Sequence, residues 1–217
     1  MLSFLRGVGP IRTHSAANNP IFYDGGRSSV TFREPNSEYI MTHTLPPETE
    51  EHGPSVLTPP FHYHMYQDEH FNVKRGVGNF YCGLGSTPAA ILTGGGGKQS
   101  TTTIKAGRYH RFENASKTED LVVDIRLTPE SYESEQRFFR NFFGYLDDCN
   151  KAKAAPSFFQ LLVFLHSADT PLAVPLPWES VGRIASRVLL TVTALWGKWI
   201  LGYRDTYPEY YEERKST

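Results

Sequence analysis

The pattern of hydrophobic and polar positions changes once along the chain, near residue 128. Before that point, short runs rich in Val, Ile, Tyr, Phe and Thr alternate with turn residues such as Gly, Pro, Asn and Asp. Runs of this kind, with no helical period between them, predict an antiparallel β-sandwich or barrel. The expected strands are 21–23, 29–33, 39–45, 61–66, 69–75, 79–84, 89–93, 101–104, 108–112 and 121–127, and the glycine run 94–97 is expected to form a hairpin turn.

After residue 128, apolar residues recur at 3.6-residue spacing, which predicts helices. The first helix would begin with Thr128 as its N-cap and Pro129 in its first turn. Further helices are expected over 156–166 and 180–203, separated by a proline-rich stretch. The chain is therefore expected to contain a β-barrel with an N-terminal arm in residues 1–128, followed by a helical extension in residues 129–217 that packs on the barrel or on a partner subunit.

The helix expected over residues 180–203 carries an apolar stripe too large to face water, so the barrel, a partner subunit or a membrane surface must cover it. Its longest uncharged run, 188–197, is about half the length of a membrane span. Arg183, Arg187 and Lys198 are too few and too scattered for the basic face of a typical surface-seeking helix. This composition favours burial on the barrel or in a homodimer over membrane surface association.

The charge balance excludes one class of partner. The 22 Lys and Arg residues against 23 Asp and Glu residues give a net charge of −1, whereas nucleic-acid-binding domains are usually strongly basic. The N-terminal segment contains Arg6 and Arg12 and no acidic residue before Asp24, as in a mitochondrial presequence, but Gly7 and Pro10 interrupt any amphipathic helix there. We therefore expect a cytoplasmic protein that does not bind nucleic acid, with mitochondrial targeting as the alternative.

Four residues have the chemistry and spacing of metal ligands. His62 and His64 are two residues apart, so on an extended segment both imidazoles point to the same side. Glu69 follows after a turn, and His110 lies on a later expected strand. Imidazoles and a carboxylate on one face suit a divalent transition metal.

These residues resemble the two metal-binding motifs of the cupin superfamily. His62, His64, Glu69 and Gly76 match the first motif, although Leu57 replaces its leading glycine. Gly107, His110 and Asn114 match the second motif, in which Lys105 replaces the usual proline. The resemblance implies a mainly β fold, a double-stranded β-helix or cupin jelly-roll barrel of the single-domain, RmlC-like kind with a C-terminal α-helical extension, and a metal bound by His62, His64, Glu69 and His110. The tail around 201–210 is similar to that of single-cupin proteins of bacteria and fungi.

Strand alternation indicates which side chains would line a substrate pocket. Tyr66 shares the parity of the histidine pair, Phe71 and Val73 that of Glu69, and Phe112 that of His110. Arg126 alternates with Ile125, so it faces either the cavity or solvent together with Asp124. His70 is expected on the sheet face opposite Glu69. The candidate pocket residues are Tyr66, Phe71, Val73, Phe112 and Arg126.

A metal with open positions in an apolar pocket can polarise a carbonyl or activate oxygen. The resemblance thus implies an enzyme acting on a small, largely apolar oxygenated molecule, as in secondary metabolism: a dioxygenase or oxidase, or a Lewis-acid isomerase, decarboxylase or cyclase. Iron, manganese and zinc are the leading metals, with nickel and copper as further candidates. A non-catalytic cupin that binds a small molecule is the alternative, and a lipid-associated protein whose tail helix docks on a membrane is a third hypothesis.

Overall fold

The computed structural model describes residues 2, 4, 6–95 and 99–213. The chain divides into two compact units, one formed by Asn19–Tyr132 and the other by Met1–Asn18 together with Glu133–Thr217. We call these the barrel unit and the helical unit.

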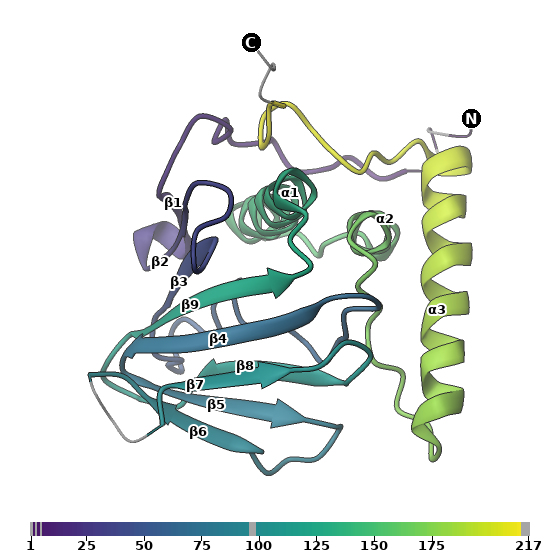
Figure 1. Ribbon diagram of the computed structural model, residues 1–217. Coiled ribbons are helices and arrows are strands. Elements are labelled where there is room, and N and C mark those ends of the chain that lie inside the picture. Colours follow the sequence, from purple (N-terminus) through teal and green to yellow (C-terminus); the bar gives the residue numbers. More distant parts are fainter. Residues whose placement is uncertain (1, 3, 5, 96–98, 214–217) are drawn as a thin grey trace. The chain divides into compact units, whose positions relative to one another are not determined.

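The barrel unit consists of two antiparallel sheets (Figure 1). The larger sheet has the strand order β1-β2-β3-β9-β4-β7 and the smaller sheet the order β6-β5-β8. The bounds are β1 Ile21–Tyr23, β2 Ser28–Phe32, β3 Met41–Leu45, β4 Asp68–Arg75, β5 Val77–Cys82, β6 Ala90–Thr93, β7 Thr101–Ile104, β8 His110–Asn114 and β9 Leu121–Thr128. The expectation of a mainly β core followed by helices is confirmed.

Two neighbouring strands of the larger sheet, β4 and β9, show the alternation that builds the core. On β4, Glu69, Phe71 and Val73 are buried, and they lie opposite Leu127, Ile125 and Val123 of β9. The rings of Phe71, Phe80 and Phe112 are mutually 5.0 to 5.7 Å apart between centroids, so they form one aromatic cluster. Such clusters add geometric specificity to the stabilisation that burial provides.

The expected strand over 61–66 is absent as a regular element of the described residues. It is replaced by a single antiparallel bridge between His62 and His110. Pro59 and Pro60 precede the segment, and because proline lacks an N–H it cannot extend a ladder in that direction. The segment is nevertheless extended enough to keep the spacing of its two histidines.

The prediction that the glycine run 94–97 joins two paired strands as a hairpin is also wrong. The flanking strands β6 and β7 belong to different sheets, β6 pairing with β5 and β7 with β4. Residues 96–98 of this run lie outside the described residues.

The helical unit contains three helices: α1 Tyr132–Lys151, α2 Phe158–Ser167 and α3 Glu179–Trp196, the last continued by a π-helical turn, Gly197–Leu201. The first helix begins later than expected because Thr128 does not cap it; this residue still pairs with Asp68 at the end of β9. Ser157 caps α2, its hydroxyl accepting a hydrogen bond from the Gln160 backbone N–H. By length and composition, the segment Glu179–Leu201 could cross a membrane; an 18-residue window of it has a mean hydropathy of 1.3 and is 28% buried.

The N-terminal arm belongs to the helical unit, and its expected place with the barrel is corrected. The Thr13 backbone N–H and hydroxyl donate to the carboxylate of Asp148 on α1, at 2.7 and 2.5 Å. Arg140, also on α1, donates to the carbonyls of Ala16 and Asn18. The Ser15 N–H donates to the Glu209 carbonyl, so the arm also runs beside the C-terminal segment (Figure 1). These polar contacts involve residues far apart in sequence, which periodicity cannot reveal.

Candidate metal centre

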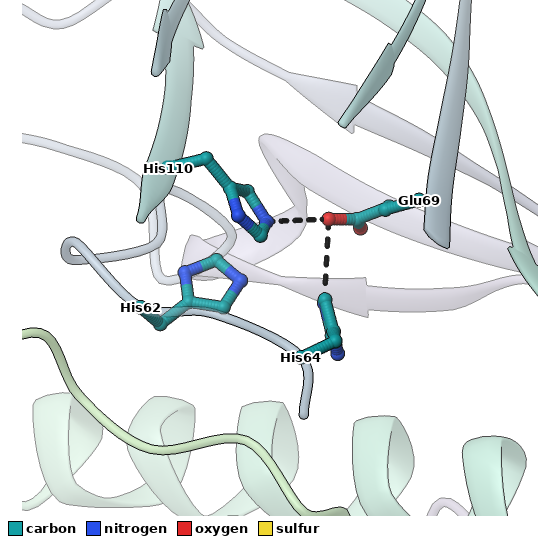
Figure 2. Close-up of side chains that lie close together, drawn as sticks. All are labelled: His62, His64, Glu69 and His110. Carbon is teal, nitrogen blue, oxygen red and sulfur yellow. Dashed lines mark hydrogen bonds and ion pairs between the residues drawn. The ribbon is translucent and has the colours of Figure 1, made fainter. Parts of the chain in front are cut away.

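Four buried side chains of the barrel unit converge on one point. They are His62 and His64 from the extended segment before β4, Glu69 from β4, and His110 from the start of β8. One potential ligand atom from each lies within 4.8 Å of all the others. Figure 2 shows the Glu69 carboxylate facing the rings of His110 and His64, with the His62 ring beside them.

Backbone pairing places the three histidines. The His62 N–H donates to the His110 carbonyl at 3.0 Å, and the His110 N–H donates back at 2.8 Å. A further bond from the Gly107 N–H to the His64 carbonyl, 2.8 Å, holds the second histidine of the pair. Glu69 points to the same interior because it is an inward position of β4, opposite Leu127. The centre is therefore fixed by strand register rather than by a flexible loop.

Two of the rings are oriented by carbonyls of their own segments. His62 Nδ1 lies 2.9 Å from the Pro60 carbonyl, and His110 Nδ1 lies 2.8 Å from the Arg108 carbonyl. Since a carbonyl only accepts, each Nδ1 must carry the proton. In the neutral rings the Nε2 lone pairs are then free to bind a metal, which is the second-shell arrangement typical of metal-ligating histidines.

The contacts at Glu69 require a cation. Its Oε2 lies 2.8 Å from His110 Nε2 and 3.3 Å from His64 Nε2. With the proton of His110 on Nδ1, the close approach of Nε2 to a carboxylate oxygen would bring two acceptors together unless a proton or a metal ion lies there. Two ligand atoms each about 2.1 Å from one ion and at a right angle are about 3 Å apart. The spacing and chemistry of the four donors thus fit a metal ion.

Electrostatics favour the metal-binding protonation states. Burial, together with the nearby His110 and His64, holds the pKa of His62 well below its usual value, so this ring is neutral at pH 7. Burial alone would raise the pKa of Glu69, but the neighbouring His64 and His110 hold it well below the usual value. The site therefore combines a neutral imidazole with an ionised carboxylate, as metal coordination demands.

The remaining motif residues shape the backbone around the centre. Gly76 has φ +78°, and a Cβ there would lie 2.3 Å from the Asp120 carbonyl oxygen. It follows the irregular pairing of β4 with β9 between Val73 and Arg75. Asn114, at the end of β8, donates to the carbonyls of Leu45 and Glu119. These residues fix the turns at the ends of the strands, and they do not contribute donors to the cluster.

The candidate pocket residues separate into two groups. Phe71, Val73 and Phe112 are buried, and Phe71 and Val73 share the inner face with Glu69; their contact with a substrate stays a prediction. The other two positions are corrected. Tyr66 is 66% exposed because it lies outside the strands, in a bend where alternation does not apply. Arg126 pairs with His70, so it occupies the face opposite Glu69.

Two further histidines flank the centre in different ways. His70 faces away from the cluster, and its ring nitrogens lie 2.9 Å from the Thr103 hydroxyl and 2.7 Å from the Thr128 hydroxyl. His43 lies on an inward position of β3 and is 2% exposed. Burial lowers its pKa to about 4, although the charge of Glu69 acts in the opposite direction. His43 was not singled out from the sequence; the alternation of Met41, His43 and Leu45 indicates only that these three residues share one face of β3.

The two antiparallel sheets, with His62, His64, Glu69 and His110 turned inward as the two sequence motifs predicted, have the arrangement of the cupin fold. Among solved structures, the cupin domain of Schizosaccharomyces pombe Cnp3 is similar at 13% identity and a TM-score of 0.35, covering 56% of this chain and 70% of that domain. A double-stranded β-helix protein from Klebsiella pneumoniae is similar at 17% identity and a TM-score of 0.32, covering 58% of this chain and 81% of that protein.

Curated relatives define the family more narrowly. The probable oxidoreductase virH of Hypocrea virens is 30% identical over 94% of this chain and 91% of its own length. The oxidoreductase iacF of Pestalotiopsis fici is 32% identical over 65% of this chain and 69% of its own length, and the epoxidase atD of Aspergillus terreus is 26% identical over 70% and 46%. No family model matches the chain. The chain belongs to the same family as the probable oxidoreductase virH.

Proposed function

We propose that the protein is a metal-dependent oxidoreductase that oxidises a small, largely apolar oxygenated molecule with dioxygen as the oxidant. The observation that carries the proposal is the buried cluster of His62, His64, Glu69 and His110, whose four donors meet within 4.8 Å. The names of the relatives, oxidoreductases and an epoxidase, support the redox class over isomerases and decarboxylases.

The chain's own residues have three tasks in this proposal. The backbone carbonyls of Pro60 and Arg108 fix the histidine tautomers. Glu69 supplies a negative charge that partly neutralises a divalent cation in a site removed from water. The inward rings of Phe71 and Phe112 would give an apolar surface for the substrate. When bound, the metal would supply Lewis acidity and a redox couple.

Redox function narrows the choice of metal. Three imidazoles and one carboxylate accept iron, manganese, zinc, nickel or copper. Zinc has no redox chemistry in proteins, so an oxidoreductase would use iron or manganese first, with copper and nickel as further candidates. A zinc-loaded protein should bind the ion and fail to consume oxygen.

The experiment combines elemental analysis, oxygen uptake and a panel of small enols, phenols and quinols. We expect about one metal ion per chain, with oxygen consumed only in the presence of the metal and a substrate. His110→Ala should lose both, while the matched variant His70→Ala, on the opposite sheet face, should keep both. A metal-free protein that takes up no iron or manganese would contradict the proposal. Turnover without oxygen uptake would place the protein among the non-redox cupins, and ligand binding without turnover would favour the non-catalytic alternative.

A further inference from the structure

Helix α3 packs within the helical unit through its small side chains. Its buried positions are Gly182, Ser186, Leu190, Thr193 and Ala194, followed by Gly197 in the π-helical turn. The neighbouring helix is α2 (Figure 1), and a Cβ at Gly197 would lie 3.1 Å from Val163 Cγ2 and 3.3 Å from the Phe159 carbonyl oxygen of that helix. Small residues at this contact allow the two backbones to approach closely.

The opposite face of α3 exposes its large apolar side chains. They are Trp178, just before the helix, and then Val181, Ile184, Val188, Leu189, Val192, Leu195, Trp196 and Trp199, each between 40% and 72% exposed. At 100° per residue these positions fall within one arc of about 140°. The face is therefore a continuous stripe along the whole helix, which we call the α3 stripe.

This distribution of large and small apolar residues is the reverse of that in a helix whose exposed face contacts water. A surface helix of a soluble protein buries its large apolar residues and exposes polar ones. Helices that face lipid instead use Gly, Ala, Ser and Thr for packing against their neighbours, because lipid solvates Leu, Val and Ile as well as a protein interior does. The inside of α3 has the composition of the second kind.

Aromatic residues and charge indicate the part of a bilayer that fits the stripe. The three tryptophans of the protein, Trp178, Trp196 and Trp199, all lie on it, near its two ends, and tryptophan prefers the headgroup level of membranes. Between Glu179 and Leu201 there are three cations and one acid, and the acid, Glu179, faces Arg183 at 3.8 Å. Arg187 and Lys198 border the stripe on one side, and Lys198 also pairs with Asp205 at 2.8 Å. Anionic headgroups complement the net positive charge of Glu179–Leu201, whereas the α3 of a second copy would bring the same net positive charge.

The N-terminal arm extends the apolar surface at the C-terminal end of α3. The Leu2 N–H donates to the Ile200 carbonyl, and Arg6 donates to the Gly202 carbonyl. Leu2 and Phe4 are 46% and 78% exposed. Another basic residue and two more exposed apolar side chains thus belong to the segment that is bonded to the C-terminal end of this helix.

From these observations we infer that the α3 stripe is a docking surface for phospholipid membranes containing anionic lipid, with the helix lying in the plane of the interface. A crossing orientation is disfavoured because Arg187 stands midway between Trp178 and Trp196 and would reach the bilayer centre. The surface fits an enzyme whose apolar substrate partitions into lipid, but it does not depend on the proposed function. This inference replaces the homodimer or barrel cover that the sequence pattern favoured.

The position of the tryptophans makes the inference directly measurable in the full-length protein. Because all three lie on the stripe, their fluorescence should shift to shorter wavelength on addition of phosphatidylcholine vesicles containing phosphatidylserine, and the protein should float with those vesicles. The double variant Val188→Gln, Val192→Gln should lower the partition coefficient by at least about tenfold. Arg187→Gln should lower it about fivefold on anionic vesicles, with little effect on neutral ones. Ile91→Gln is the matched control, since Ile91 is 58% exposed on β6 of the barrel unit.

Three results would overturn the inference. Unchanged fluorescence and no flotation with either vesicle would show that lipid does not bind the stripe. Short-wavelength emission without lipid, independent of protein concentration, would show that the barrel unit covers it. The short-wavelength emission could instead appear only as the protein concentration rises, together with a dimer detected by sedimentation. If the Val188→Gln, Val192→Gln variant lost both, a second copy of the chain would be what covers the α3 stripe. Metal content and oxygen uptake, measured on the same variants, report the proposed function separately.

Discussion

The two units of the molecule depart in opposite ways from the usual exposure of charged residues and burial of apolar ones. The barrel unit buries ionisable groups, with Glu69 4% and His110 2% exposed, whereas α3 of the helical unit exposes large apolar groups, with Trp178 72% and Ile184 65% exposed. Each arrangement costs free energy unless a partner is supplied, a cation in the first case and an apolar surface in the second. These departures from the ordinary inside-outside rule are the observations from which we propose a metal site in one unit and a lipid-docking surface in the other.

The largest expected effect follows from removing a donor from the buried cluster. His62→Ala or His110→Ala should abolish stoichiometric metal binding and lower any metal-dependent activity by at least about a hundredfold, because second-shell changes alone cost about ten- to hundredfold. Elemental analysis after dialysis against a weak chelator would measure the loss. Retention of the metal in both variants would show that the cluster is a buried hydrogen-bond network.

The next effect concerns the turn that leads from β4 to β5. Gly76→Ala should destabilise the barrel unit by about 3 kcal/mol, since it combines a left-handed φ with a clash against the Asp120 carbonyl. Gly83→Ala is the matched control: its φ is +81° but no atom lies within 4 Å of the added Cβ, so only backbone strain of about 1 kcal/mol applies. Chemical denaturation of both variants separates strain from the clash. Equal losses would mean that the neighbouring strand moves aside at no cost.

The contrast between the units also explains how far the sequence predicts the molecule. Cupin-type ligands have fixed spacing because one ion must be reached from particular strands, so the convergence of His62, His64, Glu69 and His110 was predictable. The inward position of His43 was not predictable, because the sequence of Met41–Leu45 does not show which face of the strand is turned toward the His62, His64, Glu69 and His110 cluster. Strand alternation misplaced Tyr66 for a related reason: it assumed a strand where the chain bends after a single bridge.

For α3, the sequence predicted the stripe but not the side on which the helix is packed. The same 3.6-residue period describes a helix that buries its large residues and one that buries Gly182, Ser186 and Ala194. The contact with α2, which joins segments separated by a proline-rich linker, decides between them. The N-terminal arm shows the same limit, because its contacts with Asp148 and Arg140 depend on side chains about 130 residues away.

A third prediction uses the buried histidine of the barrel unit. The pKa of His43 is about 4 in the folded protein and about 6.5 when unfolded, so between these values the unfolded state binds more protons. Stability should therefore fall as the pH drops from 6.5 towards 4 and become independent of His43 below that, a loss of at most about 3 kcal/mol. His43→Leu should show a flatter curve of unfolding free energy against pH in the metal-free protein. Parallel curves for the two proteins would contradict the burial of a neutral ring.

The smallest expected effect tests whether the helical unit has ordinary local stability apart from its exposed stripe. Ser157→Ala removes the side-chain cap of α2, whose hydroxyl accepts from the Gln160 N–H at the long distance of 3.5 Å. Caps typically contribute about 1 kcal/mol, and a bond of this length should contribute about half of that. Ser180→Ala, at an exposed position of α3, is the control and should change stability by less than about 0.5 kcal/mol. Helix α2 packs on the small residues of α3, so its stability could depend on what α3 binds. A larger loss of unfolding free energy in Ser157→Ala that anionic vesicles restore would show that lipid binding and α2–α3 packing are coupled. A loss that vesicles do not affect would show that they are independent.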